Sequence, residues 1–169
     1  RIAELHLIYA EALCQSSRGS MDKAIAQVDI VRARVGMKGL AECNPDKNLQ
    51  SNKDAFIEEL LRERACELGM EDARFFDLIR YKRADIFEKQ LHGLFIYLLD
   101  DKGVRRDLPW RGNDEGNMAY PTHFEYEKFE LNNPTRYWWT NGFDPKWYLS
   151  PFPSTEVNKG YGLGQNPGW

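Results

Sequence analysis

The sequence lacks long hydrophobic runs, a basic character and the short motifs of common catalytic sites. Its apolar stretches are only a few residues long, whereas a membrane-spanning helix needs roughly 20 apolar residues. The net charge is -3 and no run of lysines and arginines is sustained, which argues against a dedicated nucleic-acid-binding protein. With 42% hydrophobic residues, the 169-residue chain still predicts a globular unit or a large piece of one.

Cysteine and histidine are also scarce. The cysteines are Cys14, Cys43 and Cys66, and the histidines are His6, His92 and His123. Three cysteines cannot all pair within one chain, and the sequence contains no CxxC, HExxH or GxSxG pattern. The acidic residues near Asp100 and Asp114 do not follow the order of an EF-hand loop, so we interpret them as solvated surface. We therefore expect no catalytic residue, no metal and no cofactor.

Proline and tryptophan are almost confined to one part of the chain. Residues 1–99 contain one of the eight prolines and none of the five tryptophans, while residues 100–169 contain 14 of the 22 aromatic residues. This shift predicts a helical scaffold over residues 1–99 and an irregular, aromatic-rich region over residues 100–169. The predicted fold class is mainly α.

The first 36 residues have the pattern of two antiparallel helices joined by a short turn. Within residues 2–15, apolar residues three and four positions apart form one stripe: Leu5, Ile8, Tyr9, Ala12 and Leu13. After a polar turn around Gly19, Ser20 is placed to cap a second helix, which Gly36 ends. Such a pair is an αα-hairpin.

Two further helices are predicted beyond a polar loop over residues 37–51. Asn52 or Asp54 can cap a long helix whose apolar residues run from Phe56 to Leu68. Its other face carries charges of both signs, so charge pairing alone does not form this helix and its apolar face must pack. A fourth helical segment follows over residues 75–81.

Aromatic residues of the second half are the strongest binding signal. They lie among asparagine, aspartate, threonine and arginine, and a flat ring beside polar groups suits a sugar, whose C–H face stacks while its hydroxyls form hydrogen bonds. The predicted ligand-binding residues are Tyr137, Trp138, Trp139 and Trp110. The first three are successive, and three successive rings cannot easily all point inward. The alternative is that these rings simply form the core of a region with little regular structure.

Carboxylates of the same half raise a catalytic alternative. A glycoside hydrolase needs two carboxyl groups that flank the scissile bond at a defined separation. Glu125 or Glu130 would have to serve as the acid and the base. The sequence around them shows no apolar pocket signature, so solvated surface acids are the better interpretation.

Four segments carry motifs that occur in a fixed order along the chain. They are AELHLIYAEAL (3–13), AIAQVDIVRARVG (24–36), RERACELGMEDARFFDLIR (62–80) and WYLSPFPSTEVNKGYGLGQNPGW (147–169). Together they resemble the SusD/RagB family of outer-membrane nutrient-binding lipoproteins of Bacteroidetes. Two departures from the family's motifs are Asp29, where Asn is more usual, and Asp72, where Gly is usual.

The resemblance implies both a fold and a function. The fold would be α-helical, with a TPR-like helix pair followed by a loop-rich, aromatic-rich region. Residues 1–169 would be the C-terminal part of a SusD-like domain, and the N-terminal part with its lipid-bearing cysteine would lie outside this chain. The protein would be a surface-exposed lipoprotein of the cell outer membrane, attached only through that lipid anchor. It would not be an enzyme.

The implied partners are a glycan ligand and a SusC-like TonB-dependent transporter, through which the glycan is taken up. The alternative is a protein-interaction module that holds the transporter or binds peptides rather than sugars. In the third motif the charged residues are spaced for ion pairs along and between helices, and they are Arg62, Glu67, Glu71, Arg74, Asp77 and Arg80. Such residues identify the scaffold, whereas the ligand site differs between family members and is not transferred to positions here.

Overall fold

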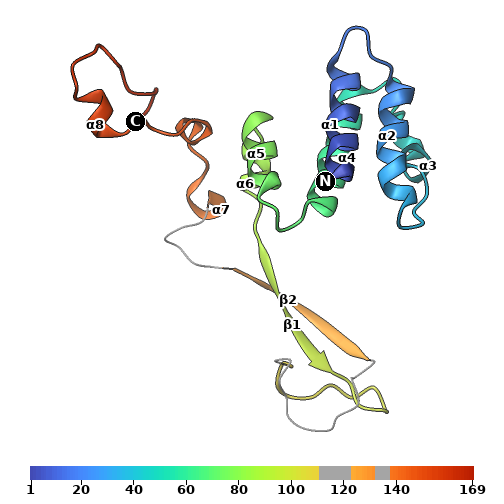
Figure 1. The fold of residues 1–169 in the computed structure, drawn as a ribbon. Helices are drawn as coiled ribbons and strands as arrows, with labels where there is room; N and C mark the ends of the chain where they lie inside the picture. The colour runs from blue at the N-terminus through green and yellow to red at the C-terminus, as the bar shows by residue number, and fades with distance from the viewer. Residues whose placement is uncertain (111–122, 132–137) are drawn as a thin grey trace. The chain divides into compact units, whose positions relative to one another are not determined.

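The protein divides into two compact units, Arg1–Lys82 and Arg83–Trp169 (Figure 1). The structure, a computed structural model, describes residues 1–110, 123–131 and 138–169, and for Trp139 the backbone only. Helices predominate in it, so the predicted mainly-α class is confirmed. Among the described helices, none has the length and apolarity that crossing a bilayer requires.

The first unit begins with the predicted αα-hairpin. Helices α1 (Ile2–Gln15) and α2 (Met21–Ala33) lie side by side, and the Ser20 side chain accepts the Lys23 backbone N–H at 3.4 Å (Figure 1). Gly36 follows α2 with φ +73°, the left-handed conformation that glycine adopts without steric cost. Both ends of the second helix therefore lie where local sequence signals predict them.

The remaining helices of this unit pack against the pair. They are α3 (Leu40–Cys43), the 3-10 turn η1 (Pro45–Lys47), α4 (Lys53–Glu67) and α5 (Ala73–Arg80). Asn52 is the cap of α4, because its Oδ1 atom accepts the Ala55 N–H at 3.0 Å. The largest apolar side chains that are fully buried in this unit are Phe56, Leu7, Leu40, Leu49, Leu60 and Val28. This single core joins α1, α2 and α4.

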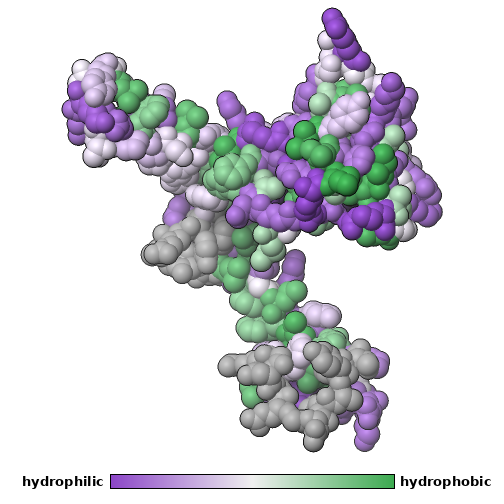
Figure 2. All heavy atoms as spheres, in the orientation of Figure 1, coloured by the Kyte–Doolittle hydropathy of each residue, from purple (hydrophilic) through white to green (hydrophobic). Residues whose placement is uncertain are grey.

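Helix α1 buries a different face from the one that its sequence stripe indicates. The α1 residues of the core are Leu7, Ala10 and Cys14. By contrast Leu5 and Tyr9 are 65% and 52% exposed. Figure 2 shows apolar side chains gathered on the surface of this unit over the N-terminal half of α1. The helix is therefore apolar on two faces, and α2 and α4 cover only one of them.

The second unit contains short helices and one β-hairpin. Its elements are α6 (Ala84–Phe87), β1 (His92–Leu98), β2 (Phe124–Glu130), α7 (Trp138–Asn141), the 3-10 turn η2 (Pro145–Tyr148) and α8 (Ser154–Val157). Strands β1 and β2 are antiparallel, in a register that runs from His92 opposite Glu130 to Leu98 opposite Phe124. Residues on alternate positions therefore line opposite faces of the hairpin.

The hairpin is a difference from the sequence prediction. Strand β1 lies within the range expected to be helical scaffold. Along the sequence, the boundary between the two units follows Lys82 rather than residue 99. The physical reason is that a short apolar run such as residues 94–99 has no decisive period. Its partner strand begins 26 residues after β1 ends (98 to 124), so no local signal announces the pairing.

Candidate functional site

One face of the β-hairpin carries a row of three aromatic rings. The register places Ile96 opposite Tyr126 and Leu98 opposite Phe124 on this face. The Trp110 N–H donates to the Ile96 carbonyl at 2.6 Å. The Trp110 ring centroid lies 5.6 Å from that of Phe124, which in turn lies 6.4 Å from that of Tyr126. We call Trp110, Phe124 and Tyr126 the hairpin aromatic row.

The hairpin aromatic row offers ring surface to solvent. Tyr126 is 62% exposed, while Trp110 and Phe124 are half-buried and hold the row together. Rings spaced in this way, with a tyrosine hydroxyl at one end, suit a ligand that presents C–H faces and hydroxyl groups. Of this row, the sequence interpretation named only Trp110 as a binding residue. The signal for the others is the alternation of aromatic and charged residues in FEYEKFE over residues 124–130.

The opposite face of the hairpin is organised by one arginine. Arg105 lies over the Tyr97 ring, with its guanidinium carbon 3.9 Å from the ring centroid. Its Nη1 atom pairs with Glu125 at 3.1 Å and Glu127 at 3.0 Å. On this face Phe129 also stacks on Phe95, with centroids 4.3 Å apart. The arginine therefore ties both strands to each other.

The register bears directly on the hydrolase alternative. Glu125 and Glu130 are five positions apart in β2, so their side chains leave opposite faces of the hairpin. Two catalytic carboxyl groups must flank one glycosidic bond. This pair does not converge on a single sugar, and the hydrolase alternative loses its proposed acid and base.

The second described aromatic group is a packed cluster around Trp138. Phe87 and Phe143 are buried and stack with centroids 4.6 Å apart. The half-buried Trp138 ring approaches them at 4.7 Å and 5.4 Å, and Trp147 packs on Phe143 at 5.5 Å. Trp138 is thus a structural part of this unit's C-terminal core as well as a candidate for binding.

The four predicted binding residues are distributed between these groups. Trp110 belongs to the hairpin aromatic row and Trp138 to the packed cluster. Tyr137 lies outside the described residues, and for Trp139 only the backbone, in α7, is described. The run Tyr137-Trp138-Trp139 therefore remains a prediction.

The C-terminal motif closes a loop onto itself through side-chain amides and an indole. Gln165 both accepts from the Phe152 N–H at 2.8 Å and donates to the Phe152 carbonyl at 2.9 Å. Asn166 donates to the Ser150 carbonyl at 2.6 Å. The Trp169 Nε1–H is shared between the carbonyls of Lys146 and Leu149, at 3.1 Å and 3.0 Å. These hydrogen bonds give the residues of the motif a structural role, because they hold the C-terminal loop in one conformation.

The charged residues of the third motif join helices of the first unit. Arg64 Nε pairs with Asp77 at 2.7 Å, and Asp77 also binds Arg80 Nη2 at 2.8 Å. Arg80 in turn forms a two-pronged ion pair with Glu11 of α1. Helices α1, α4 and α5 are thereby linked through one chain of charges.

The other motif residues lie at the edge of this network. Arg62 binds Glu59 at 2.8 Å and Arg74 donates to the Leu61 carbonyl at 3.0 Å. Glu67 pairs with Arg1 at 2.6 Å and with Arg34 at 2.8 Å, and Glu71 also pairs with Arg1. The pairs of Glu67 attach α4 to α2 and to the residue that precedes α1.

The electrostatics of this network centre on Glu11, which the sequence interpretation did not single out. Burial acts to raise the pKa of Glu11, but hydrogen bonds from Arg80 and from Tyr81, whose hydroxyl donates at 2.6 Å, outweigh it and lower the pKa. Burial and the bond to Glu11 raise the pKa of the Tyr81 hydroxyl. The Glu11 carboxylate is accordingly held in its charged form.

Metal-ligating side chains do not gather in the part of the chain that the structure describes. No group of three or more histidine, cysteine, aspartate or glutamate residues is close enough to hold an ion there. Asp114, from the acidic loop considered above, lies outside that part. The described residues therefore provide aromatic surfaces and ion pairs.

Comparison with known proteins identifies the family. A solved structure, that of a SusD-like protein from Bacteroides fragilis, matches with a TM-score of 0.65 and 23% identity, over 99% of this chain. The match covers 25% of that protein's chain, so the sequence spans about a quarter of its length. No curated protein matches the sequence. The model of the SusD family matches residues 1–169, and the chain belongs to that family.

Proposed function

We propose that the protein binds glycans at the outer-membrane surface without catalysis and passes them to a SusC-like TonB-dependent transporter. The observation that carries the proposal is the family match over residues 1–169. We propose the lipid anchor and the transporter partner on the same ground, the membership of the SusD family.

The hairpin aromatic row supports the glycan part of the proposal. An exposed tyrosine beside two half-buried rings provides a stacking surface held on a strand pair, which positions it better than an isolated loop would. Acidic and basic groups flank the row, since Lys128 and Glu130 share its face with Tyr126. Ring surface with polar neighbours is the composition that sugar recognition needs. Tyr137, Trp138 and Trp139 are proposed as further contacts.

The test is isothermal titration of the full-length protein against a panel of oligosaccharides. Saturable binding with micromolar to millimolar affinity, without release of reducing sugar, would support non-catalytic capture and name the glycan class. If no oligosaccharide of the panel binds, and the protein instead binds peptides or co-purifies with the transporter, the result would support the interaction-module alternative. Reducing sugar released on incubation would contradict the non-catalytic proposal.

A further inference from the structure

The hairpin aromatic row ends beside an exposed lysine on the same face of the hairpin. Lys128 follows Tyr126 by two positions in β2, and side chains at alternate positions of a strand lie on one face. Two positions of an antiparallel strand span about 7 Å. A sugar ring stacked on Tyr126 would therefore place its substituents within reach of the long, flexible lysine side chain.

The charge of Lys128 is available to a ligand. Within residues 1–110, 123–131 and 138–169, its ammonium group forms no ion pair and no hydrogen bond. The residue opposite it in the register is Leu94, an apolar side chain that is 57% exposed. Glu130, which shares the face, lies two positions further from the rings, so Lys128 stands between this carboxylate and Tyr126.

The opposite face of the hairpin differs in this respect. There the cation is Arg105, and its Nη1 atom is already bound to two carboxylates, Glu125 at 3.1 Å and Glu127 at 3.0 Å. A negatively charged ligand on that face would compete with both carboxylates for one guanidinium group. The hairpin therefore presents an unpaired cation beside the aromatic row and a neutralised one behind it.

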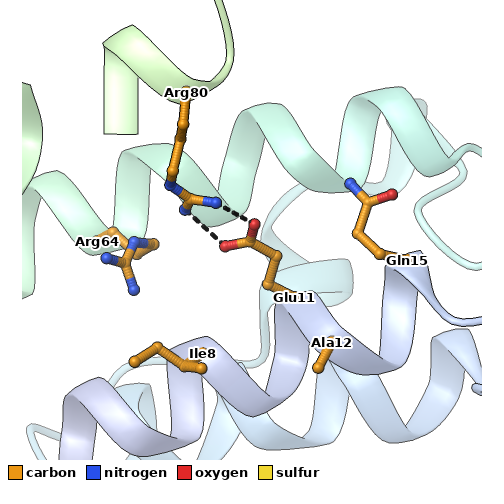
Figure 3. A pocket seen from close by; sticks show the side chains of 6 residues that line it. All are labelled: Ile8, Glu11, Ala12, Gln15, Arg64 and Arg80. Atoms are coloured by element: carbon orange, nitrogen blue, oxygen red, sulfur yellow. Dashed lines mark hydrogen bonds and ion pairs between the residues drawn. The ribbon is translucent and has the colours of Figure 1, made fainter. Parts of the chain in front are cut away.

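The arginines that line the pocket of the first unit are also paired. Arg80 forms its two-pronged ion pair with Glu11, as Figure 3 shows, and Arg64 is bound to Asp77 at 2.7 Å. An anion in this pocket would have to displace carboxylates that hold helices together. The pocket has a volume of about 410 Å³ and is lined by Ile8, Glu11, Ala12, Gln15, Arg64 and Arg80.

We propose that the hairpin aromatic row binds acidic glycans and that Lys128 recognises their negative charge. The charged group is the carboxylate of a uronic acid or a sulfate ester, carried next to the sugar ring that stacks on Tyr126. An ammonium group acts as a point charge and therefore accepts either group, whereas a guanidinium favours a two-pronged partner. This inference rests on the proposed function of glycan binding and names the chemical class of the glycan.

The test extends the titration of the full-length protein to pairs of oligosaccharides. An oligogalacturonate is compared with its neutral methyl ester, and a sulfated galactan oligosaccharide with its desulfated form. We expect the acidic member of at least one pair to bind about three- to tenfold more tightly than its neutral counterpart, as one partly exposed charge pair allows. The pair that shows the preference distinguishes the carboxylate from the sulfate.

Substitutions of Lys128 assign the preference to this residue. Lys128→Gln should remove the preference and leave the affinity for the neutral counterpart unchanged, whereas Lys128→Arg should retain it. Lys159→Gln, which removes one positive charge at an exposed position after α8, is the control and should also retain it. Raising the salt concentration from about 0.1 M to about 1 M shortens the Debye length from about 10 Å to about 3 Å and should weaken binding of the acidic member alone.

The possible contrary results separate this inference from the proposed function. Neutral counterparts that bind as tightly as the acidic members would overturn the inference and leave glycan capture standing. A preference for acidic members that survives Lys128→Gln would overturn the assignment to the hairpin aromatic row. If no oligosaccharide binds, acidic or neutral, the result would contradict the proposed function and this inference with it.

Discussion

Arg64 donates from Nε to a carboxylate oxygen of Asp77 at 2.7 Å, and the two side chains are 7% and 2% exposed. The pair joins α4 to α5, which follow each other along the chain through a short turn with residues in the left-handed conformation. A buried ion pair is not strongly stabilising compared with apolar packing, but each partner depends on the other. The pair is therefore a point at which a single substitution has a large effect.

Replacing Asp77 is expected to destabilise the protein strongly. Asp77→Ala leaves the Arg64 charge buried without its partner, which costs about 3–5 kcal/mol in the free energy of unfolding. Urea unfolding followed by circular dichroism measures the loss. The control is Glu42→Ala, which removes an ion pair to Lys38 whose two side chains are 74% and 59% exposed. A similar loss in both variants would show that burial of the Arg64–Asp77 pair is not what matters.

Acid is expected to destabilise the first unit through Glu11. Its pKa in the folded protein is below the ordinary value of 4.5, so its ion pair with Arg80 stabilises the fold fully above that pH. The stabilisation is lost as the pH falls through the lower folded pKa. Glu11→Gln should therefore reduce stability at neutral pH and make the difference from the parent shrink below pH 4.5.

The control for the acid experiment is Asp85→Asn. A hydrogen bond from Arg83 lowers the pKa of Asp85 as well, but the Asp85 side chain is 58% exposed, so solvent screens the pair. Thermal melts over a pH series compare both variants with the parent. A constant stability difference for Glu11→Gln across the series would show that the charge of Glu11 does not contribute.

The helical unit could be predicted from the sequence to the extent that its signals are local. Ser20 and Asn52 each cap the helix that follows, because the serine and asparagine side chains accept an N–H within the first turn. Gly36 ends the second helix for a similarly local reason, its positive φ. Signals of this kind involve at most a few neighbouring residues, so a single sequence contains them in full.

Contacts between distant segments could not be predicted in the same way. On α1, the stripe through Leu5 and Tyr9 has the same helical spacing as the core face through Leu7 and Cys14, and only packing distinguishes them. The aromatic row of the candidate site depends on the strand pairing that brings Phe124 and Tyr126 to β1. Composition indicated that this half is rich in rings, but not which of them share a surface.

The backbone conformation of Asp72 explains why aspartate is tolerated where the family's motif usually has glycine. Asp72 has φ +58°, a left-handed conformation in which Gly carries no steric cost and aspartate is tolerated. Asp72→Gly should leave the free energy of unfolding nearly unchanged, whereas Asp72→Ala should lower it by about 1 kcal/mol. Denaturant titration of the two variants checks this. Equal stabilities for Gly and Ala would contradict the conformational explanation.

Gly93 is expected to be required by the hairpin. A Cβ atom there would lie 2.2 Å from the tip of the Phe129 ring, which is fixed by stacking on Phe95. Gly93→Ala should displace the ring and cost about 1–3 kcal/mol of hairpin stability. Faster limited proteolysis of the hairpin would report it. Gly164→Ala, at a position with nothing within 4 Å, is the control and should not change the cleavage rate.

Tyr126 is expected to contribute directly to glycan binding. Its ring is exposed at the end of the hairpin aromatic row, and loss of one stacking ring of this kind should weaken a bound oligosaccharide by about tenfold. Tyr161→Ala is the matched control, since Tyr161 is 76% exposed in a turn of the C-terminal region. Titration calorimetry of Tyr126→Ala, Tyr126→Phe and Tyr161→Ala separates the ring from its hydroxyl. If Tyr126→Ala binds as tightly as the parent while Trp139→Ala does not, the binding surface includes the predicted run at residues 137–139 and excludes the hairpin.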